Sequence, residues 1–356
     1  MKKHNFSPGP AILPASVLEE ASQGVVEING SGLSILEISH RSQIFMAIIE
    51  EAEQLVRELL AVSDNYAVLF LTGGASTQFA MVPMNLLGEQ ETAAYVNTGS
   101  WSDKAIKEAK LFGHVEVLAS SKEQNYTFIP KDYSIPAQAK YLHITSNNTI
   151  FGTQYHAWPD TTLPLVSDMS SDILNRPIDI DRFGLIYAGA QKNLGPAGVT
   201  LVLIRKDLAG KPPRPLPAMF NYQTHIENGS LYNTPPVFPI YVCLLTLRWL
   251  KANGGMPAMA AQNENKAKLL YDEIDANPLF EGTAAKIDRS LMNVTFAMPN
   301  KELEKPFLQA CEAAGCVELK GHRSVGGFRA SIYNAMPLES VQLLVDVMRD
   351  FAQQHG

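Results

Sequence analysis

Hydrophobic residues between positions 63 and 206 occur in short runs that alternate with segments of helical spacing. The run at 66–71 is typical of a buried strand, and the apolar side chains of 77–87 recur at helical intervals. Strands that alternate with helices predict parallel pairing in a central sheet with helices on both faces. Further strands are expected at 93–96, 115–118, 141–145, 163–167, 185–188 and 199–204, with a helix at 102–112.

The C-terminal part of the chain has a different pattern. Strand-like runs at 292–298, 316–319 and 328–333 flank a helical segment at 302–314, and the amphipathic segment 338–352 follows them. This order predicts a smaller α+β unit, joined through a helical stretch at about 256–274. The fold class is therefore α/β, with a large, mostly parallel sheet domain and a smaller C-terminal α+β domain.

Composition limits the classes of function. Apolar residues make up 46% of the 356 residues and charged residues 18%, a balance typical of a globular protein. The formal net charge is -7 and no long basic run occurs, so nucleic-acid binding is not expected. Cys243, Cys311 and Cys316 lack the CxxC spacing of a zinc site, which predicts free thiols, no metal and a cytoplasmic location. No apolar run has the length of a membrane-spanning helix.

Ligand-binding loops in such a sheet lie beyond the carboxyl ends of its strands. At the end of the first strand, Gly73 and Gly74 let the backbone approach a ligand closely, and Ala75 and Ser76 follow. The amides of a first helical turn, together with the helix dipole, can bind an anion. Taken alone, the same residues are better explained by a tight turn with a serine N-cap.

Two other strand ends carry a carboxylate and an amine. Asp168 follows the run at 163–167, where it is either an ordinary turn residue or a partner for the protonated nitrogen of a pyridine ring. Lys192 lies among small residues at 190–198, where burial would favour the neutral amine that attacks aldehydes. An anion site, a carboxylate and an amine are what pyridoxal phosphate requires. The combination predicts this cofactor, bound to Lys192 as a Schiff base.

Trp101 and Thr149 complete the set of cofactor contacts expected from the residues themselves. Trp101 comes shortly after the strand at 93–96 and offers a flat surface for stacking on the pyridine ring, although most tryptophans are packing residues. Thr149 follows the strand at 141–145, where its hydroxyl could reach the phenolic oxygen of the ring or could simply belong to a turn.

Taken in order, these motifs resemble the phosphoserine aminotransferase family of fold-type I, class V pyridoxal-phosphate enzymes. The resemblance extends over nearly the whole chain, and it implies a large cofactor-binding domain at 16–255 and a small domain formed by 1–15 and 256–356. The segments that carry it are 5–11, 37–42, 73–76, 97–101, 149, 167–168, 189–196, 232–236 and 322–331.

The resemblance also implies roles for individual residues. Ala75, Ser76 and Gln191 would hold the cofactor phosphate, together with Asn233 and Thr234 of a second subunit, so a homodimer is expected. Arg329 would bind the substrate α-carboxylate. The distal anion would be held by His40 and Arg41, and by His322 and Arg323 from the neighbouring subunit. Arginine suits both ends of a dianionic substrate because it binds carboxylate and phosphate bidentately.

The implied reaction is a ping-pong transamination that interconverts O-phospho-L-serine and 2-oxoglutarate with 3-phosphohydroxypyruvate and L-glutamate, in serine biosynthesis and also in pyridoxine biosynthesis. Some members of the family carry arginine at the position of Ser76, so phosphate binding in this chain would depend more on Arg41 and Arg323. An alanine–glyoxylate or serine–pyruvate aminotransferase is the main alternative, because it would share Lys192 and Asp168 without a second basic pocket. A cysteine desulfurase fits less well, because this chain has no cysteine in a strand-end loop near the site. A nicotinamide dehydrogenase is disfavoured because no G-x-G-x-x-G follows the first strand. A non-catalytic binding protein would need neither Lys192 nor Asp168.

Overall fold

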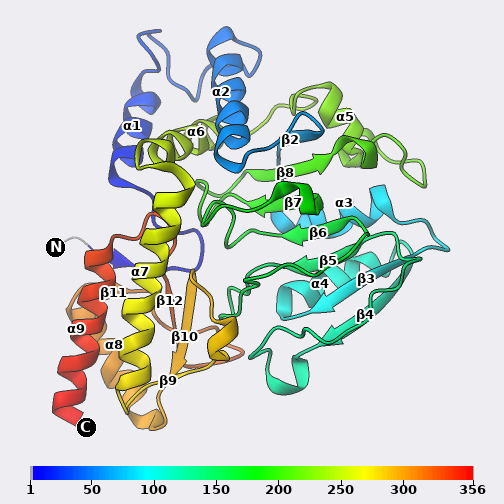
Figure 1. Cartoon of the computed structure of the whole chain (residues 1–356). Helices are drawn as coiled ribbons and strands as arrows, with labels where there is room; N and C mark the ends of the chain where they lie inside the picture. Colours follow the sequence, from blue (N-terminus) through cyan, green and yellow to red (C-terminus); the bar gives the residue numbers. More distant parts are fainter. Residues whose placement is uncertain (1–2, 356) are drawn as a thin grey trace.

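A seven-stranded sheet forms the centre of the larger part of the molecule (Figure 1). The computed structural model describes residues 3–355. The strand order is β2-β8-β7-β6-β5-β3-β4. Strand β8 runs antiparallel to both of its neighbours, and the other pairs are parallel. The bounds are β2 Tyr66–Leu71, β3 Thr92–Asn97, β4 His114–Ser120, β5 Leu142–Thr145, β6 Leu165–Asp168, β7 Phe183–Gly189 and β8 Thr200–Arg205.

Helices cover both faces of this sheet, and for that reason its central strands are buried along their whole length. Helices α3 (Gly74–Leu86) and α4 (Ser100–Ala109) pack on the face that carries Tyr95, Val166 and Tyr187. On the opposite face lie α1 (Ala15–Val26), α2 (Gln43–Leu60) and α6 (Val237–Ala252). The short helix α5 (Tyr222–Glu227) contacts β2. Alternate residues of each strand therefore belong to two separate apolar cores.

The smaller part of the molecule has its own apolar core. It contains the antiparallel strands β9 (Glu281–Gly282), β10 (Asn293–Ala297) and β12 (Phe328–Ser331), with β10 in the middle. Helices α8 (Glu304–Ala313) and α9 (Leu338–His355) pack against them. Each buried phenylalanine contributes about 1.5–3 kcal/mol. The ring cluster that fills this core is Phe280, Phe296, Phe307, Phe328 and Phe351.

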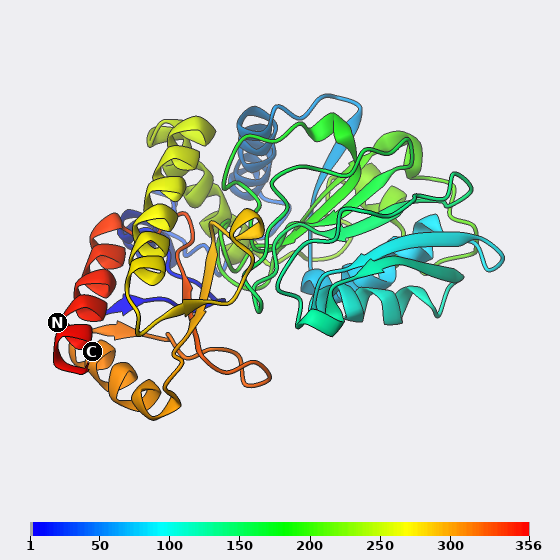
Figure 2. The same cartoon turned by 60° about the horizontal axis from the view of Figure 1, so that its bottom comes forward.

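Two segments connect the parts. Helix α7 (Gly255–Ala276) places Met256 and Met259 in the core of the large part, and Leu270 and Ile274 in the core of the small part. At the N-terminus, β1 (His4–Asn5) pairs in parallel with β11 (Cys316–Val317), so the start of the chain lies beside its C-terminal elements (Figure 2). We propose that the large and small parts correspond to the predicted domains, 16–255 and 1–15 with 256–356.

The predicted elements agree closely with the observed ones, with two corrections. Helix α3 begins at Gly74, so Ala75 and Ser76 lie in its first turn and Gly73, with φ of 90°, is its N-cap. Strand β8 is antiparallel because the loop at 190–199, which contains no crossover helix, leads the chain back along the sheet, whereas a parallel strand needs such a crossover. Short 3-10 helices lie at Lys122–Gln124, Ile180–Arg182, Lys206–Leu208, Ala218–Phe220, Lys286–Asp288 and Lys301–Leu303.

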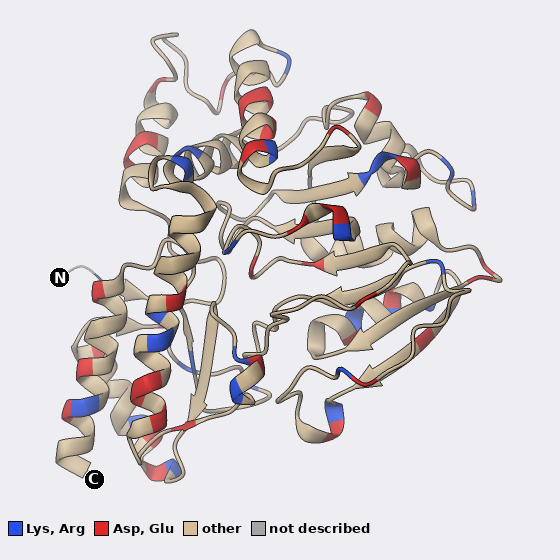
Figure 3. Cartoon of the chain, in the orientation of Figure 1, with Lys and Arg blue, Asp and Glu red and all other residues tan. Residues whose placement is uncertain are grey.

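Charged residues of both signs are interspersed over the helices (Figure 3). Arg248 and Lys251 of α6 form ion pairs with Glu51 and Glu58 of α2. Such exposed pairs contribute at most about 1 kcal/mol each. The helix contact therefore depends mainly on buried apolar side chains. Within residues 3–355, no helix is long and apolar enough to cross a membrane.

Candidate active site

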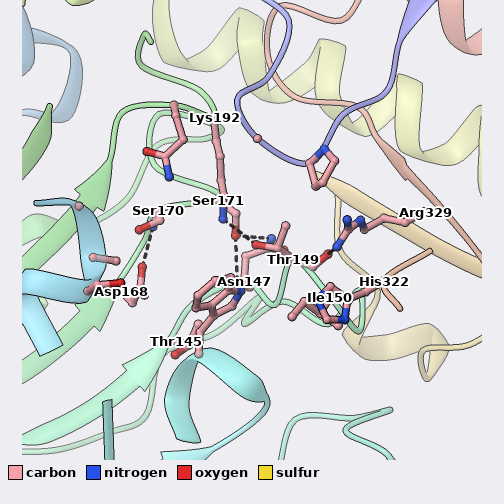
Figure 4. A pocket seen from close by; sticks show the side chains of 17 residues that line it. Thr145, Asn147, Thr149, Ile150, Asp168, Ser170, Ser171, Lys192, His322 and Arg329 are labelled. Carbon is pink, nitrogen blue, oxygen red and sulfur yellow. Dashed lines mark hydrogen bonds between the residues drawn. The ribbon is translucent and has the colours of Figure 1, made fainter. Parts of the chain in front are cut away.

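A pocket of about 320 Å³ opens at the carboxyl ends of β5, β6 and β7, between the large and small parts of the molecule (Figure 4). It brings together every residue predicted to contact the cofactor from this chain. It also contains two of the residues predicted to bind substrate. The predicted residues that line it are Ala75, Ser76, Trp101, Thr149, Asp168, Gln191, Lys192, His322 and Arg329.

Lys192 lies just beyond the end of β7, and its side chain points into the pocket. The ammonium Nζ donates a hydrogen bond to Thr149 Oγ1 over 2.7 Å. The pKa of Lys192 is lowered to about 8, mainly by burial; the charge of Asp168 opposes this fall and that of Arg329 contributes to it. A substantial fraction of this amine is therefore neutral and nucleophilic near neutral pH.

The N-terminal segment covers Lys192. Gly9 has φ of 140°, and a Cβ atom at this position would lie 3.3 Å from Cγ of Lys192. Next to it, the amide of Ala11 donates to the carbonyl of Gln191 over 2.8 Å. Glycine is required at position 9 both by its backbone conformation and by this close approach. The sequence motif at 5–11 contained this residue, but nothing in the motif indicated that it would contact the lysine.

Asp168 is the last residue of β6 and is only 4% exposed. Its Oδ1 accepts the amide hydrogen of Ser170 over 2.9 Å. Burial raises the pKa of Asp168, while hydrogen bonds from Ser170 and the charge of Lys192 oppose that rise. A buried carboxylate gains most from a cationic hydrogen-bond donor, so this position suits the protonated nitrogen of a heterocycle.

The start of α3 provides an anion site on the same pocket. Gly74, Ala75 and Ser76 form its first turn, in which the backbone amides have no partner within the helix. The positive end of the helix dipole adds to their attraction for an anion. A Cβ atom on Gly73 would collide with the side chain of Thr77, so glycine is needed where the strand turns into the helix.

Trp101 lies in the first turn of α4, and the centre of its ring is 6.0 Å from Nζ of Lys192. Its Nε1 is buried and has no hydrogen-bond partner among the described residues. The ring therefore offers a flat face to a planar ligand beside Lys192 and one unused donor. The chemistry of these groups (amine, carboxylate, anion site and stacking face) fits pyridoxal phosphate.

Arg329 projects from β12 on the opposite side of the pocket. It is 7% exposed, and its Nη1 donates to the carbonyl of Thr149 over 3.1 Å. Its Nε is buried without a partner among residues 3–355. A buried guanidinium with an unused donor is suited to bind a carboxylate bidentately. His322 lines the pocket beside it, and partial burial together with Arg329 lowers the pKa of His322.

The remaining predicted residues do not line this pocket. His40 is half-buried and Arg41 exposed on the segment before α2, and Arg323 is exposed next to His322. Asn233 and Thr234 lie on the loop before α6. The prediction assigned His322 to the pocket of a neighbouring subunit, whereas in the single chain it lines the pocket of its own subunit.

Three residues near Asp168 were not predicted. Ser170 binds Asp168, and Ser171 lines the pocket. Asp172 is buried one turn beyond Asp168 and accepts hydrogen bonds from Ser146 and Gln154. Burial raises the pKa of Asp172 to about 6. The one available signal was the polar stretch at 170–172 directly after Asp168, which is equally typical of a turn.

The shifted pKa of Lys192 predicts the pH dependence of its reactivity in cofactor-free protein. With a pKa of about 8, about 10% of the amine is neutral at pH 7 and about 90% at pH 9. Because the folded state lowers this pKa, modification by an amine-reactive anhydride should rise about tenfold between pH 7 and pH 9 and then level off. Mass spectrometry of labelled peptides measures the rate at which Lys192 is modified, with exposed Lys206 as the internal reference. A rate that still climbs steeply above pH 9 would contradict the lowered pKa.

Comparisons with known proteins place this fold and site in one class. A family model described as Aminotransferase class-V matches residues 3–344. A phosphoserine aminotransferase of Phocaeicola vulgatus is 56% identical over 358 aligned positions, which cover 100% of both chains.

Solved structures agree with this result. A phosphoserine aminotransferase from Bacillus circulans subsp. alkalophilus has a TM-score of 0.97 at 51% identity, covering 100% of this chain and 99% of the other. A pyridoxal-phosphate-bound phosphoserine aminotransferase from Trichomonas vaginalis has a TM-score of 0.94 at 38% identity, covering 98% and 100%. The chain belongs to the phosphoserine aminotransferase family, and the predicted family and α/β fold are confirmed.

Proposed function

We propose that this chain is a pyridoxal-phosphate-dependent phosphoserine aminotransferase. It would transfer an amino group from L-glutamate to 3-phosphohydroxypyruvate, giving 2-oxoglutarate and O-phospho-L-serine, as a step of serine biosynthesis. The observation that carries this proposal is a single pocket that combines the partly buried amine of Lys192, the buried carboxylate of Asp168 and the first turn of α3. Family membership and the level of identity support the same reaction.

The pocket residues divide the work of holding the cofactor. The amides of Ala75 and Ser76, with Gln191, would bind its phosphate, and Trp101 would stack on its ring. Asp168 would bind the ring nitrogen and keep it protonated. Bound pyridoxal phosphate supplies an electron sink for the bond that breaks at the substrate Cα. Lys192 would hold the cofactor covalently until an amino acid displaces it.

Lys192 would then move the proton. Its amine, once released, would accept the Cα proton as a base and return it as an acid to the cofactor carbon on the other side of the amino nitrogen. Thr149 receives a hydrogen bond from Nζ and so keeps the amine in the pocket. A pKa of about 8 suits both directions, because neither the neutral nor the charged form is strongly disfavoured near neutral pH.

Arg329 would bind the α-carboxylate of each substrate. The distal carboxylate or phosphate would be held by two histidine–arginine pairs, His40 with Arg41 and His322 with Arg323, one pair from each subunit of a homodimer. In support, His40 and Arg41 lie away from the pocket of their own chain, in a region where Leu33 and Leu36 are exposed. Exposed apolar side chains are typical of a surface that a partner covers.

Asn233 and Thr234 would complete the phosphate site from that partner. They lie outside the pocket of their own chain, next to Tyr232, which is 45% exposed. Serine at position 76 adds no positive charge to the distal pocket, so the phosphate would depend more strongly on Arg41 and Arg323. Further proposals are a cytoplasmic location, which the free Cys243, Cys311 and Cys316 support, and a second substrate in pyridoxine biosynthesis, which rests on the family resemblance alone.

The amino acceptor provides the test of this function. Enzyme that has already reacted with glutamate should be mixed with 3-phosphohydroxypyruvate, pyruvate or glyoxylate, and the return of its original visible absorbance followed. We expect rapid return with the phosphorylated keto acid and little with the others, because only the first fills both anion sites. Return with pyruvate or glyoxylate but not with the phosphorylated acid would favour the alanine–glyoxylate or serine–pyruvate alternative. A colourless protein that takes up no pyridoxal phosphate would refute the whole proposal.

A further inference from the structure

A pair of buried asparagine side chains joins the two parts of the molecule behind the pocket. Asn293 begins β10 in the small part and is 0% exposed, and Asn147 follows β5 in the large part and is 2% exposed. Asn147 Nδ2 donates to Asn293 Oδ1 over 2.7 Å, although the two residues are 146 positions apart in the sequence. Asn147 itself lines the pocket (Figure 4), and Asn293 does not.

Both amides use their polar atoms fully. Asn293 Nδ2 donates to Ser331 Oγ over 2.9 Å and to Tyr333 Oη over 3.1 Å. Asn147 Nδ2 also donates to Ser171 Oγ over 2.8 Å, and its Oδ1 accepts from the hydroxyl of Ser290. A fully bonded buried network has one favourable arrangement, because any shift leaves a buried polar atom without a partner. The pair therefore fixes the position of β10 relative to the end of β5.

The strand that this network holds, β10, is paired with β12, which carries Arg329. In the β10–β12 pairing, Asn293 lies opposite Ser331 and Thr295 opposite Arg329. Two more hydrogen bonds run from this pair of strands to the loop after β5. Thr295 Oγ1 donates to the carbonyl of Phe151 over 3.1 Å, and Arg329 donates to that of Thr149. The same loop provides the hydroxyl of Thr149 that binds Lys192. The separation of Arg329 and Lys192 thus depends on a short series of buried contacts.

The network also reaches the segment that covers Lys192. Tyr333, which accepts from Asn293, donates from its hydroxyl to the carbonyl of Pro8 over 2.8 Å. Pro8 precedes Gly9, the residue packed against the side chain of Lys192. Asn293 therefore contacts groups that position both the guanidinium and the cover of the amine, without touching the pocket itself.

We propose that Asn293 is a positioning residue for substrate binding: through Asn147, Ser331 and Tyr333 it sets the distance between Arg329 and Lys192. The proposal rests on the proposed function, in which Arg329 binds the α-carboxylate. Cofactor binding uses groups of the large part alone, so the loss of Asn293 should weaken substrate binding and leave the cofactor in place. Loosening Arg329 weakens the hold on each substrate without removing a group that reacts, so the effect should appear mainly in KM.

The test is Asn293→Ala in the cofactor-loaded enzyme. We expect unchanged cofactor content, KM values for glutamate and 3-phosphohydroxypyruvate raised by about tenfold or more, and kcat within about threefold of the unmodified enzyme. The dissociation constant of α-methylglutamate, which has no Cα proton to lose, should rise by a similar factor in titration calorimetry. This measurement reports binding without turnover.

Asn263→Ala is the matched control. Asn263 is also 0% exposed and also joins separate segments, donating to the carbonyl of Asn175 and to Asn334, but neither of these hydrogen bonds goes to β10 or β12. This variant should lose stability and keep its KM values. If Asn293→Ala does not fold, Thr295→Val removes the neighbouring contact to Phe151 and should raise KM by a few-fold.

The outcomes separate this inference from the proposed function. A wild-type protein that binds no cofactor or transfers no amino group would refute the proposed function. Active wild-type enzyme with equal KM changes in Asn293→Ala and Asn263→Ala would overturn the positioning role, and so would an unchanged KM in both Asn293→Ala and Thr295→Val. Loss of cofactor from Asn293→Ala with normal KM in the remaining loaded fraction would also overturn it.

Discussion

Replacing Lys192 by alanine is expected to lower the rate of transamination by about 10⁴-fold, the upper range for the loss of a positioned acid–base group. The change removes the amine that would both hold the cofactor and carry the proton. The groups that would bind phosphate and ring nitrogen, at the start of α3 and at Asp168, remain in place. The variant should therefore still take up pyridoxal phosphate, but borohydride should no longer attach it to the protein. Cofactor uptake is measured by absorbance, covalent attachment by mass spectrometry after borohydride reduction, and transamination by single-turnover rates.

Lys206→Ala is the control for this experiment, because Lys206 is exposed and lies in a 3-10 helix after β8. It should retain normal rates and normal borohydride attachment. Added methylamine should partly restore proton transfer in Lys192→Ala, since a small amine can occupy the space left in the pocket. A Lys192→Ala enzyme that keeps more than about a tenth of the normal rate would show that another group moves the proton.

Much of the fold could be predicted because the positions of strands and helices follow from local patterns of apolar residues. The apolar run at 66–71 has the same bounds as β2, and the strand expected at 199–204 differs from β8 by one residue at each end. The direction of β8 was not predictable from alternation, because an antiparallel neighbour depends on how the chain returns after β7. In the same way, Gly73 and Gly74 indicated a turn, but only the structure places Ala75 and Ser76 inside the first turn of α3.

The site was predictable where one strand end positions one side chain. Asp168 ends β6 and Lys192 follows β7, and parallel neighbours bring their carboxyl ends to the same edge of the sheet. The contact of Gly9 with Lys192 and the bond between Asn147 and Asn293 join residues far apart in the chain. Neither follows a period or a motif, so such contacts could not be predicted from the sequence pattern.

The second large effect is expected at Asp168. Changing it to alanine should lower the transamination rate by about 10²- to 10⁴-fold, because removing one partner of a buried charged pair costs about 3–5 kcal/mol. The carboxylate is 4% exposed, so water cannot easily replace it as a partner for the ring nitrogen. Without it the ring would lose its proton and become a weaker electron sink, while phosphate binding at α3 and attachment to Lys192 continue. Rapid-mixing measurements of each half-reaction give the rate.

A permanently charged cofactor separates this electrostatic role from a structural one. Pyridoxal phosphate methylated at the ring nitrogen keeps its positive charge without a partner. It should therefore raise the transamination rate of Asp168→Ala at least tenfold. Asp160→Ala serves as the control, since Asp160 is fully exposed and pairs only loosely with Arg182, at 3.7 Å. It should behave as the unmodified enzyme. If the methylated cofactor gives no recovery while the variant remains folded and loaded, then Asp168 acts by orienting the ring, and the charge on the nitrogen does not limit the reaction.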